Sequence, residues 1–308
     1  MCSECIKKYI REVISMSEVI RISNGKLSAV IRPEGGQIVS CTAPDGREVI
    51  WQADPAIWAD HTPILFPVIG NCKDGSVIID GKTYPMTKHG FARKAMFTPA
   101  IVGENYVTLE LTESSATLKM YPFAFTLQIT YELTDNGFRC IFEVENQSEK
   151  PMPFCVGGHP AFVLPMEDGT AFEDYKVIFP DDEEVVNLLC PGGQLITGSE
   201  KLVFKGGMLN LSHAIFDEKD TLMLPELKSR SVDVIHKTSG HGLRFSWEGM
   251  EAFAIWSRPV NHGNYVCLEP WHGLPGMVSD SGVFTEKRYA TILAPGEEYT
   301  CGFEVELI

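Results

Sequence analysis

The stretch FTLQITYEL at residues 125–133 alternates apolar and polar side chains over its whole length. Successive side chains of a β-strand point to opposite faces, so this spacing puts all five apolar residues on one side. The same period of two returns at residues 107–112, 138–144 and 299–307. Each stretch predicts a half-buried strand, and the last one places the C-terminus in a sheet.

Turn signals separate the strand-like runs at short intervals. They are NG at 24–25, PDG at 44–46, DG at 80–81, DNG at 135–137 and PG at 295–296. Tight turns of this kind join antiparallel strands. No regular alternation of strands with helices follows residue 18. We therefore predict an all-β fold, a large antiparallel β-sandwich.

The N-terminus differs from this body. Residues 4–15 place apolar side chains on one stripe of a short amphipathic helix, and basic residues interrupt the run, so no export signal is evident. No composition break or linker divides the remainder. We predict an N-terminal extension over residues 1–17 and one β domain over residues 18–308.

Composition narrows the function classes. The 308 residues contain 26 Lys and Arg against 41 Asp and Glu, a formal charge of −15, which repels nucleic acid and anionic membranes. The nine cysteines are scattered and odd in number, as in reduced cytosolic proteins. We expect a cytoplasmic protein, a monomer or homodimer, that binds a small molecule and neither nucleic acid nor membrane.

Two histidines stand beside glycines. His89 lies in KHGFAR at 88–93, where a glycine follows it and Arg93 comes four positions later. His159 lies in VGGHPAF at 156–162, where glycines and a proline restrict the backbone around the imidazole. Such placement suits an acid or base held in a fixed position. The alternative is that each is a structural histidine hydrogen-bonded within a loop.

Several chemistries lack their sequence signals. The chain has no G-x-S-x-G, no P-loop and no G-x-G-x-x-G. His89, His159 and a carboxylate could hold a metal ion, but no H-x-H or H-x-x-x-H pair brings two imidazoles together. We predict no metal site.

Five motifs, taken in order, resemble the aldose 1-epimerase (galactose mutarotase-like) family, and specifically its LacX-type branch. They are LFPVIG (65–70), DGKTYPMTKHGFAR (80–93), GGHPAF (157–162), CLEPWHG (267–273) and ILAPGEEY (292–299). The resemblance covers residues 18–308. It implies a β-supersandwich whose concave sheet holds one sugar ring, without cofactor or metal, and an isomerase that interconverts the α and β anomers of a hexose.

The resemblance also implies residue roles. A glutamate takes the proton of the anomeric hydroxyl while a histidine protonates the ring oxygen. By the motifs, the base is Glu297, the acid is His159, and His89 is a second histidine near the ring oxygen. Glu298 is the alternative base.

The implied sugar site has further members. Asp220 resembles the family's sugar-binding aspartate, with Asp217 as the alternative. Arg93 and Glu269 would line the site, and Trp271 would offer an apolar ring face, although a tryptophan in a sheet protein is often a core residue.

One position departs from the family pattern. Galactose mutarotases carry an arginine shortly before the hairpin that leads to the first histidine, and here the comparable residue is Asn71. Lys73 and Arg93 are the nearest substitutes. We therefore include Asn71 among the expected substrate-binding residues and leave the sugar open.

Two other functions compete with a free-hexose epimerase. A hexose-6-phosphate 1-epimerase would need Arg and Lys for the phosphate, and no basic cluster lies near the motifs. A non-catalytic carbohydrate-binding protein could use the same scaffold. The presence of two histidines and a glutamate favours catalysis, because binding alone requires neither acid nor base.

Overall fold

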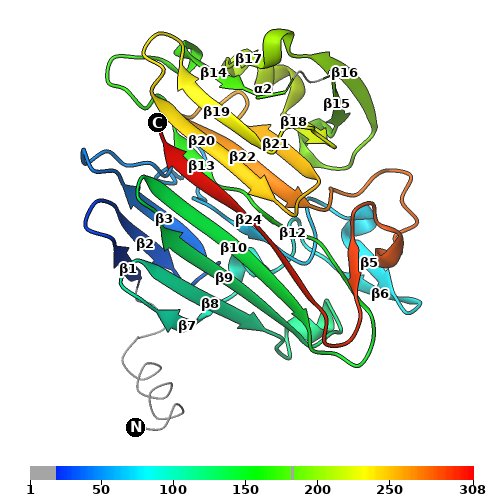
Figure 1. Ribbon diagram of the computed structural model, residues 1–308. Coiled ribbons are helices and arrows are strands. Elements are labelled where there is room, and N and C mark those ends of the chain that lie inside the picture. Colours follow the sequence, from blue (N-terminus) through cyan, green and yellow to red (C-terminus); the bar gives the residue numbers. More distant parts are fainter. Residues whose placement is uncertain (1–18, 182–183) are drawn as a thin grey trace, which may run out of the picture.

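The computed structural model describes residues 19–181 and 184–308. The predicted N-terminal helix and extension lie outside these residues. The largest sheet has nine strands (Figure 1), in the spatial order β17 (Met208–Asn210), β14 (Tyr175–Ile178), β19 (Ser231–His236), β20 (Gly242–Glu248), β24 (Glu298–Leu307), β10 (Gly137–Asn146), β9 (Phe125–Leu133), β8 (Tyr106–Thr112) and β7 (Thr98–Val102).

A six-stranded sheet forms the second layer. Its order is β18 (Thr221–Pro225), β21 (Ala252–Trp256), β22 (Tyr265–His272), β12 (Val156–Gly158) and β4 (Ile64–Leu65), and β13 (Ala161–Val163) also pairs with β22. A three-stranded sheet contains β1 (Ile20–Ser23), β2 (Ser28–Arg32) and β3 (Gln37–Thr42). Strand pairings within the described sheets are antiparallel, which confirms the predicted all-β antiparallel fold.

Short pairs and helices complete the chain. The pairs are β5 (Ser76–Ile79) with β6 (Lys82–Pro85), β15 (Glu184–Leu189) with β16 (Gly198–Val203), and β11 (Met152–Phe154) with β23 (Thr291–Leu293). Among the residues that the structure describes, the α-helix is α2 (His213–Lys219), and the 3-10 helices are η1 (Lys73–Gly75), η2 (Ala92–Lys94), η3 (Thr117–Lys119), η4 (Phe172–Asp174), η5 (Pro191–Gly193), η6 (Lys205–Gly207) and η7 (Phe284–Glu286). Within the described residues, no helix is long and apolar enough to cross a membrane.

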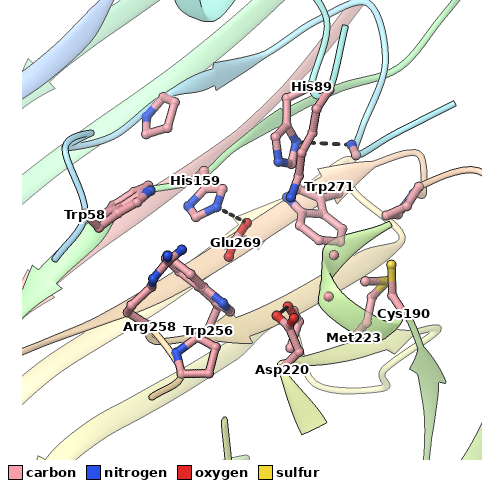
Figure 2. A pocket seen from close by; sticks show the side chains of 18 of the residues that line it. Trp58, His89, His159, Cys190, Asp220, Met223, Trp256, Arg258, Glu269 and Trp271 are labelled. Atoms are coloured by element: carbon pink, nitrogen blue, oxygen red, sulfur yellow. Dashed lines mark hydrogen bonds and ion pairs between the residues drawn. The ribbon is translucent and has the colours of Figure 1, made fainter. Parts of the chain in front are cut away.

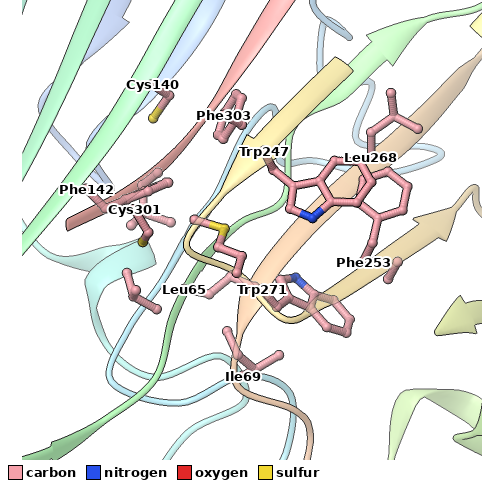
Figure 3. Close-up of a cluster of buried hydrophobic side chains, with 14 of the residues drawn as sticks. Leu65, Ile69, Cys140, Phe142, Trp247, Phe253, Leu268, Trp271, Cys301 and Phe303 are labelled. Atoms are coloured by element: carbon pink, nitrogen blue, oxygen red, sulfur yellow. The ribbon is translucent and has the colours of Figure 1, made fainter. Parts of the chain in front are cut away.

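The core lies between the two main sheets. The alternation of residues 125–133 buries the apolar face of β9, and register pairs Ile129 with Phe142 of β10. Across the layers, Trp247 of β20 stacks on Phe253 of β21, with ring centroids 4.2 Å apart (Figure 3). Burial of these rings and of the other apolar side chains between the sheets stabilises the sandwich.

Strand β22 is buried on both faces, unlike the half-buried strands of the large sheet. The side chains of Val266 and Leu268 belong to the main hydrophobic core. The side chains of Tyr265 and Cys267 belong to a second, small cluster that also contains Trp51 and Ala161. Because side chains alternate along a strand, Glu269 shares the face of Tyr265 and Cys267. This second face of β22 is the floor of the candidate site.

Candidate active site

A pocket on β22 collects most of the sequence-predicted site residues (Figure 2). Its cavity volume is about 200 Å³, below the ~300–1,000 Å³ of sites for drug-sized ligands. Its walls come from segments far apart in the chain: Trp58, Pro63, Gly70, Lys88, His89, Arg93, His159, Cys190, Gly192, Gly193, Asp220, Thr221, Met223, Trp256, Arg258, Pro259, Glu269, Trp271 and Pro275. Its size suits one monosaccharide.

Two hydrogen bonds with the backbone of Gly70 hold His89 in the pocket wall, at the top of Figure 2. The His89 N–H donates to the Gly70 carbonyl at 2.8 Å, and the Gly70 N–H donates to His89 Nδ1 at 3.1 Å. Because Nδ1 accepts, the proton of the neutral ring is on Nε2. Burial, followed by the charges of His159, Lys88 and Arg93, lowers the pKa of His89 well below its ordinary value. His89 is therefore a neutral hydrogen-bond donor.

His159 follows β12 directly, and close packing requires the glycines before it. A Cβ on Gly157 would lie 2.7 Å from the Trp271 ring, and one on Gly158 would lie 2.9 Å from the Phe303 ring. The His159 N–H donates to the Pro63 carbonyl at 3.1 Å. The two glycines thus let the chain pass between the sheets and bring the imidazole over β22.

His159 and Glu269 meet at the centre of the pocket. His159 Nε2 lies 3.2 Å from Glu269 Oε2, and Glu269 is only 1% exposed. Burial raises the pKa of the Glu269 carboxyl well above its ordinary value, while Lys88 lowers it and Asp220 raises it further. Burial also lowers the pKa of His159 to about 3. The common cause is the cost of removing a charge from water.

Several buried polar atoms of the pocket lack a hydrogen-bond partner among the described residues. They are Arg93 Nε, His159 Nδ1, Glu269 Oε2 and Trp271 Nε1. The Glu269 contact with His159 is thus at ion-pair distance without hydrogen-bond geometry. Buried polar groups normally have partners. Their clustering indicates a site that keeps donors and acceptors for a polar ligand.

Aromatic rings surround His159. Trp58 stacks on its ring at 5.1 Å between centroids, and Trp256 meets it edge-on at 5.6 Å. Trp271, 2% exposed, lines the pocket and also packs in the core. Apolar ring faces beside polar groups suit a sugar ring. Sequence analysis missed Trp58 and Trp256, which lie outside the five motifs.

The structure brings Asp220 and Arg93 into the pocket as predicted. Asp220 ends α2 with φ of 62°. Its alternative, Asp217, does not line the pocket and instead binds His262 Nε2 at 3.0 Å. Arg93 pairs with Asp60, which holds the guanidinium against the wall while Nε stays free of partners among the described residues.

The prediction that Glu297 belongs to this site is wrong. Glu297 is exposed, does not line the pocket, and accepts the Ala294 N–H at 2.8 Å through its carboxylate. It closes the turn between β23 and β24, and its neighbour Glu298 pairs with Glu145 in the large sheet. The buried carboxylate beside the histidines is Glu269, which the sequence analysis had placed only among the lining residues.

The structure does not place Asn71, predicted to bind substrate, in the pocket wall. Asn71 does not line the pocket, and its Nδ2 donates to the Gly193 carbonyl at 2.9 Å. The suggested substitute Lys73 donates to the Asp280 carbonyl at 2.7 Å and is likewise absent from the pocket wall. Asn71 instead holds η5, which forms part of that wall.

Basic residues missed by the sequence analysis line the pocket beside Arg93. They are Lys88 and Arg258. Lys88 directly precedes His89, and Arg258 follows β21 far along the chain. Lys88 and Arg258 form no basic cluster in the sequence, because only the fold brings them into the same pocket.

One set of side chains here has the composition of a metal site. Ligand atoms of His159, Cys267 and Glu269 lie within 4.8 Å of one another. Cys267 is fully buried, and burial raises the pKa of its thiol well above the ordinary value. Metal binding there would require a thiolate and would occupy both His159 and Glu269.

Comparisons with known proteins agree on one family. The family model for aldose 1-epimerase matches residues 18–306. The plasmid-encoded and chromosomal forms of protein LacX from Lactococcus lactis subsp. lactis are each 31% identical over 270 residues, which span 85% of this chain and 90% of the relative.

Solved structures share the fold. A galactose mutarotase related enzyme from Lactobacillus acidophilus superimposes with a TM-score of 0.89 at 29% identity, covering 94% of this chain and 97% of that one. A galactose mutarotase-like protein from Lactobacillus casei ATCC 334 gives a TM-score of 0.87 at 28% identity, covering 94% and 100%.

Proposed function

Because the chain belongs to the aldose 1-epimerase family, we propose that it interconverts the α and β anomers of a hexose. The observation that carries this proposal is the contact of 3.2 Å between His159 Nε2 and Glu269 Oε2 in a pocket of monosaccharide size. Acid–base opening of a pyranose ring needs one group to remove a proton and another to supply one.

In the proposed reaction Glu269 is the base. Its carboxylate removes the proton of the anomeric hydroxyl, the oxygen electron pair forms the aldehyde, and the bond between C1 and the ring oxygen breaks. Burial raises the pKa of Glu269, so the ionised form is a stronger base than an exposed carboxylate. Rotation of the aldehyde and reversal of these steps give the other anomer.

His159 is the proposed acid. As the ring oxygen of the sugar gains negative charge, the N–H of the His159 imidazole donates its proton to that oxygen. When the sugar ring closes again, the proton returns to the imidazole. Because burial keeps His159 uncharged, the proton moves only when the oxygen becomes basic. His89, a neutral donor through Nε2, supports the same oxygen. The exchange consumes nothing, so it needs no external oxidant, reductant or cofactor.

The remaining wall residues bind the sugar in this proposal. Asp220 accepts hydrogen bonds from ring hydroxyls, Arg93 donates through its free Nε, and the tryptophans cover apolar ring faces. A carbohydrate-binding protein without catalysis would need these contacts but not the buried acid–base pair.

Anomer exchange measured by NMR on galactose and glucose tests the proposal. We expect the wild type to accelerate exchange and His159→Asn to lose about 10²–10⁴ of the rate. His241→Asn, at an exposed histidine outside the pocket, is the matched control and should exchange like the wild type. Sugar binding by calorimetry without any acceleration would replace the proposal with a carbohydrate-binding function.

A further inference from the structure

Three basic side chains line the pocket, beside the carboxyl groups of Asp220 and Glu269. Lys88, Arg93 and Arg258 line it, in a chain whose formal charge is −15. Arg93 is neutralised by Asp60. No described carboxylate lies within ion-pair distance of Lys88 or Arg258. Two cations of the wall are therefore available to a ligand.

Lys88 directs its charge over the pocket, although its side chain is exposed. A Cβ built on Gly193 would lie 2.8 Å from Lys88 Nζ, which places the ammonium against η5. The charge of Lys88 also lowers the pKa values of His89, Glu269 and the Cys190 thiol. The ammonium thus acts on the interior of the pocket and not only on solvent.

Arg258 stands at the His159 end of the pocket. It follows Trp256 by two residues, and Trp256 contacts both His159 and Trp58, with centroids 5.6 Å and 5.3 Å apart. Figure 2 shows Arg258 on the Trp58 side of Glu269, whereas Asp220 and Trp271 lie on the other side.

The proposed reaction fixes which part of a sugar reaches Arg258. If the anomeric hydroxyl faces Glu269, the ring oxygen faces His159. In a pyranose the ring oxygen is bonded to C5, which carries C6. The C6 substituent therefore leaves the ring at the His159 end, where Arg258 lies.

We propose that this pocket selects aldoses that carry an anionic group at C6, a phosphate ester or a carboxylate, over neutral hexoses. Arg258 binds the anion, for which its planar guanidinium offers paired donors. Lys88 adds positive potential from the wall formed by Cys190 and Gly193. This inference rests on the proposed epimerase function and names its substrate class.

Anomer exchange is measured by NMR for glucose, glucose 6-phosphate and glucuronate, and for the galactose series. We expect kcat/KM for an anionic sugar to exceed that for its neutral parent by about tenfold or more, since a hydrogen bond to a charged group contributes a factor of about 10–100. Preference for the 6-phosphate alone assigns a phosphate, and preference for glucuronate or galacturonate alone assigns a carboxylate.

Variants test the residues. Arg258→Met should bring the anionic-to-neutral ratio of kcat/KM down by about 10- to 100-fold, and Arg258→Lys should lose less because it keeps the charge. Lys26→Met removes an exposed lysine that pairs with Asp135 away from the pocket and should keep the ratio. Thermal melting checks that each variant is folded.

The inference is overturned if neutral hexoses exchange as efficiently as their anionic counterparts, or if Arg258→Met keeps the preference. Either result leaves the epimerase function intact. If no sugar exchanges faster than in buffer, the epimerase function fails instead. In that case, calorimetric titration with glucose and glucose 6-phosphate tests whether the pocket prefers anionic sugars. Equal affinities would overturn this preference, and a higher affinity for glucose 6-phosphate that depends on Arg258 would support it.

Discussion

Glu269 has an environment that penalises its own ionisation. The carboxyl is buried on β22 beside a neutral imidazole, and burial raises its pKa well above the ordinary value. A base must be ionised to act, so activity is absent below this pKa and appears as pH rises through it. Burial lowers the pKa of His89 well below its ordinary value and that of His159 to about 3, which favours the neutral form of both rings.

The pH profile of kcat/KM follows from these directions. We expect one acid limb, with its midpoint above pH 4.5, the ordinary value for a glutamate, and no second step near 6.5 from a histidine. The measurement is the initial rate of anomer exchange across pH 4 to 9. A midpoint at or below 4.5 would contradict Glu269 as the base.

Two neighbours of Glu269 should move that midpoint in opposite directions. Lys88 lowers the pKa of Glu269 and Asp220 raises it. Lys88→Met should therefore shift the acid limb to higher pH, and Asp220→Asn should shift it to lower pH. Lys26→Met is the control for loss of a positive charge elsewhere. If the acid limb of kcat/KM moved in the same direction in both pocket variants, it would report the ionisation of a group other than Glu269.

Sequence motifs identified the histidines of the site but not its proposed base. His89 and His159 each sit among glycines whose spacing is a local signal. Glu269 occupies a strand position with no local sign of its burial, whereas Glu297 follows a conspicuous Pro-Gly turn. The distance between the Glu269 carboxylate and the His159 imidazole depends on how the sheet packs, so it cannot be predicted from a short sequence motif.

At the scale of elements, η5 forms a wall of the pocket and is held by a side chain outside it. Asn71 Nδ2 donates to the Gly193 carbonyl at 2.9 Å, while Gly192 and Gly193 both adopt positive φ. None of the residues of η5 is buried. Asn71 is therefore a positioning residue for the loop that carries Cys190 and approaches Lys88.

Asn71→Ala should raise KM more than it lowers kcat. Loss of one hydrogen bond, worth about 0.5–1.5 kcal/mol, predicts an increase in KM of about 2- to 10-fold as the wall loosens. Gln194→Ala is the matched control, because its amide binds the Gly192 carbonyl within the same loop at 3.4 Å. Equal effects of the two variants, or an effect on kcat alone, would contradict the positioning role.

The strands themselves were predictable from residue periodicity. Alternation at 125–133, 138–144 and 299–307 gives β9, β10 and β24, which are neighbours in the large sheet. The order of strands was not predictable in the same way. Strand β24 pairs with β10 and β20 because long-range burial selects those partners. That choice also decides which loops meet at the pocket.

For the whole molecule, the pocket draws its walls from residues 58 to 275, and the family match begins at residue 18. A variant that lacks residues 1–17 should therefore keep its melting temperature within a few degrees and its exchange activity within about twofold. Circular dichroism and the NMR assay measure both. Loss of soluble protein would show that the domain extends to the N-terminus.

The central claim is that Glu269 is the base of an anomer-exchanging site. Glutamate-to-glutamine substitution keeps the side-chain shape and removes its basicity. We therefore compare the exchange rates of Glu269→Gln and Glu297→Gln on the best sugar found, with calorimetric binding as the check on folding and affinity. The account predicts that Glu269→Gln binds sugar and loses about 10²–10⁴ of the rate, while Glu297→Gln matches the wild type. Near-normal exchange in Glu269→Gln, or collapse in Glu297→Gln, would contradict it.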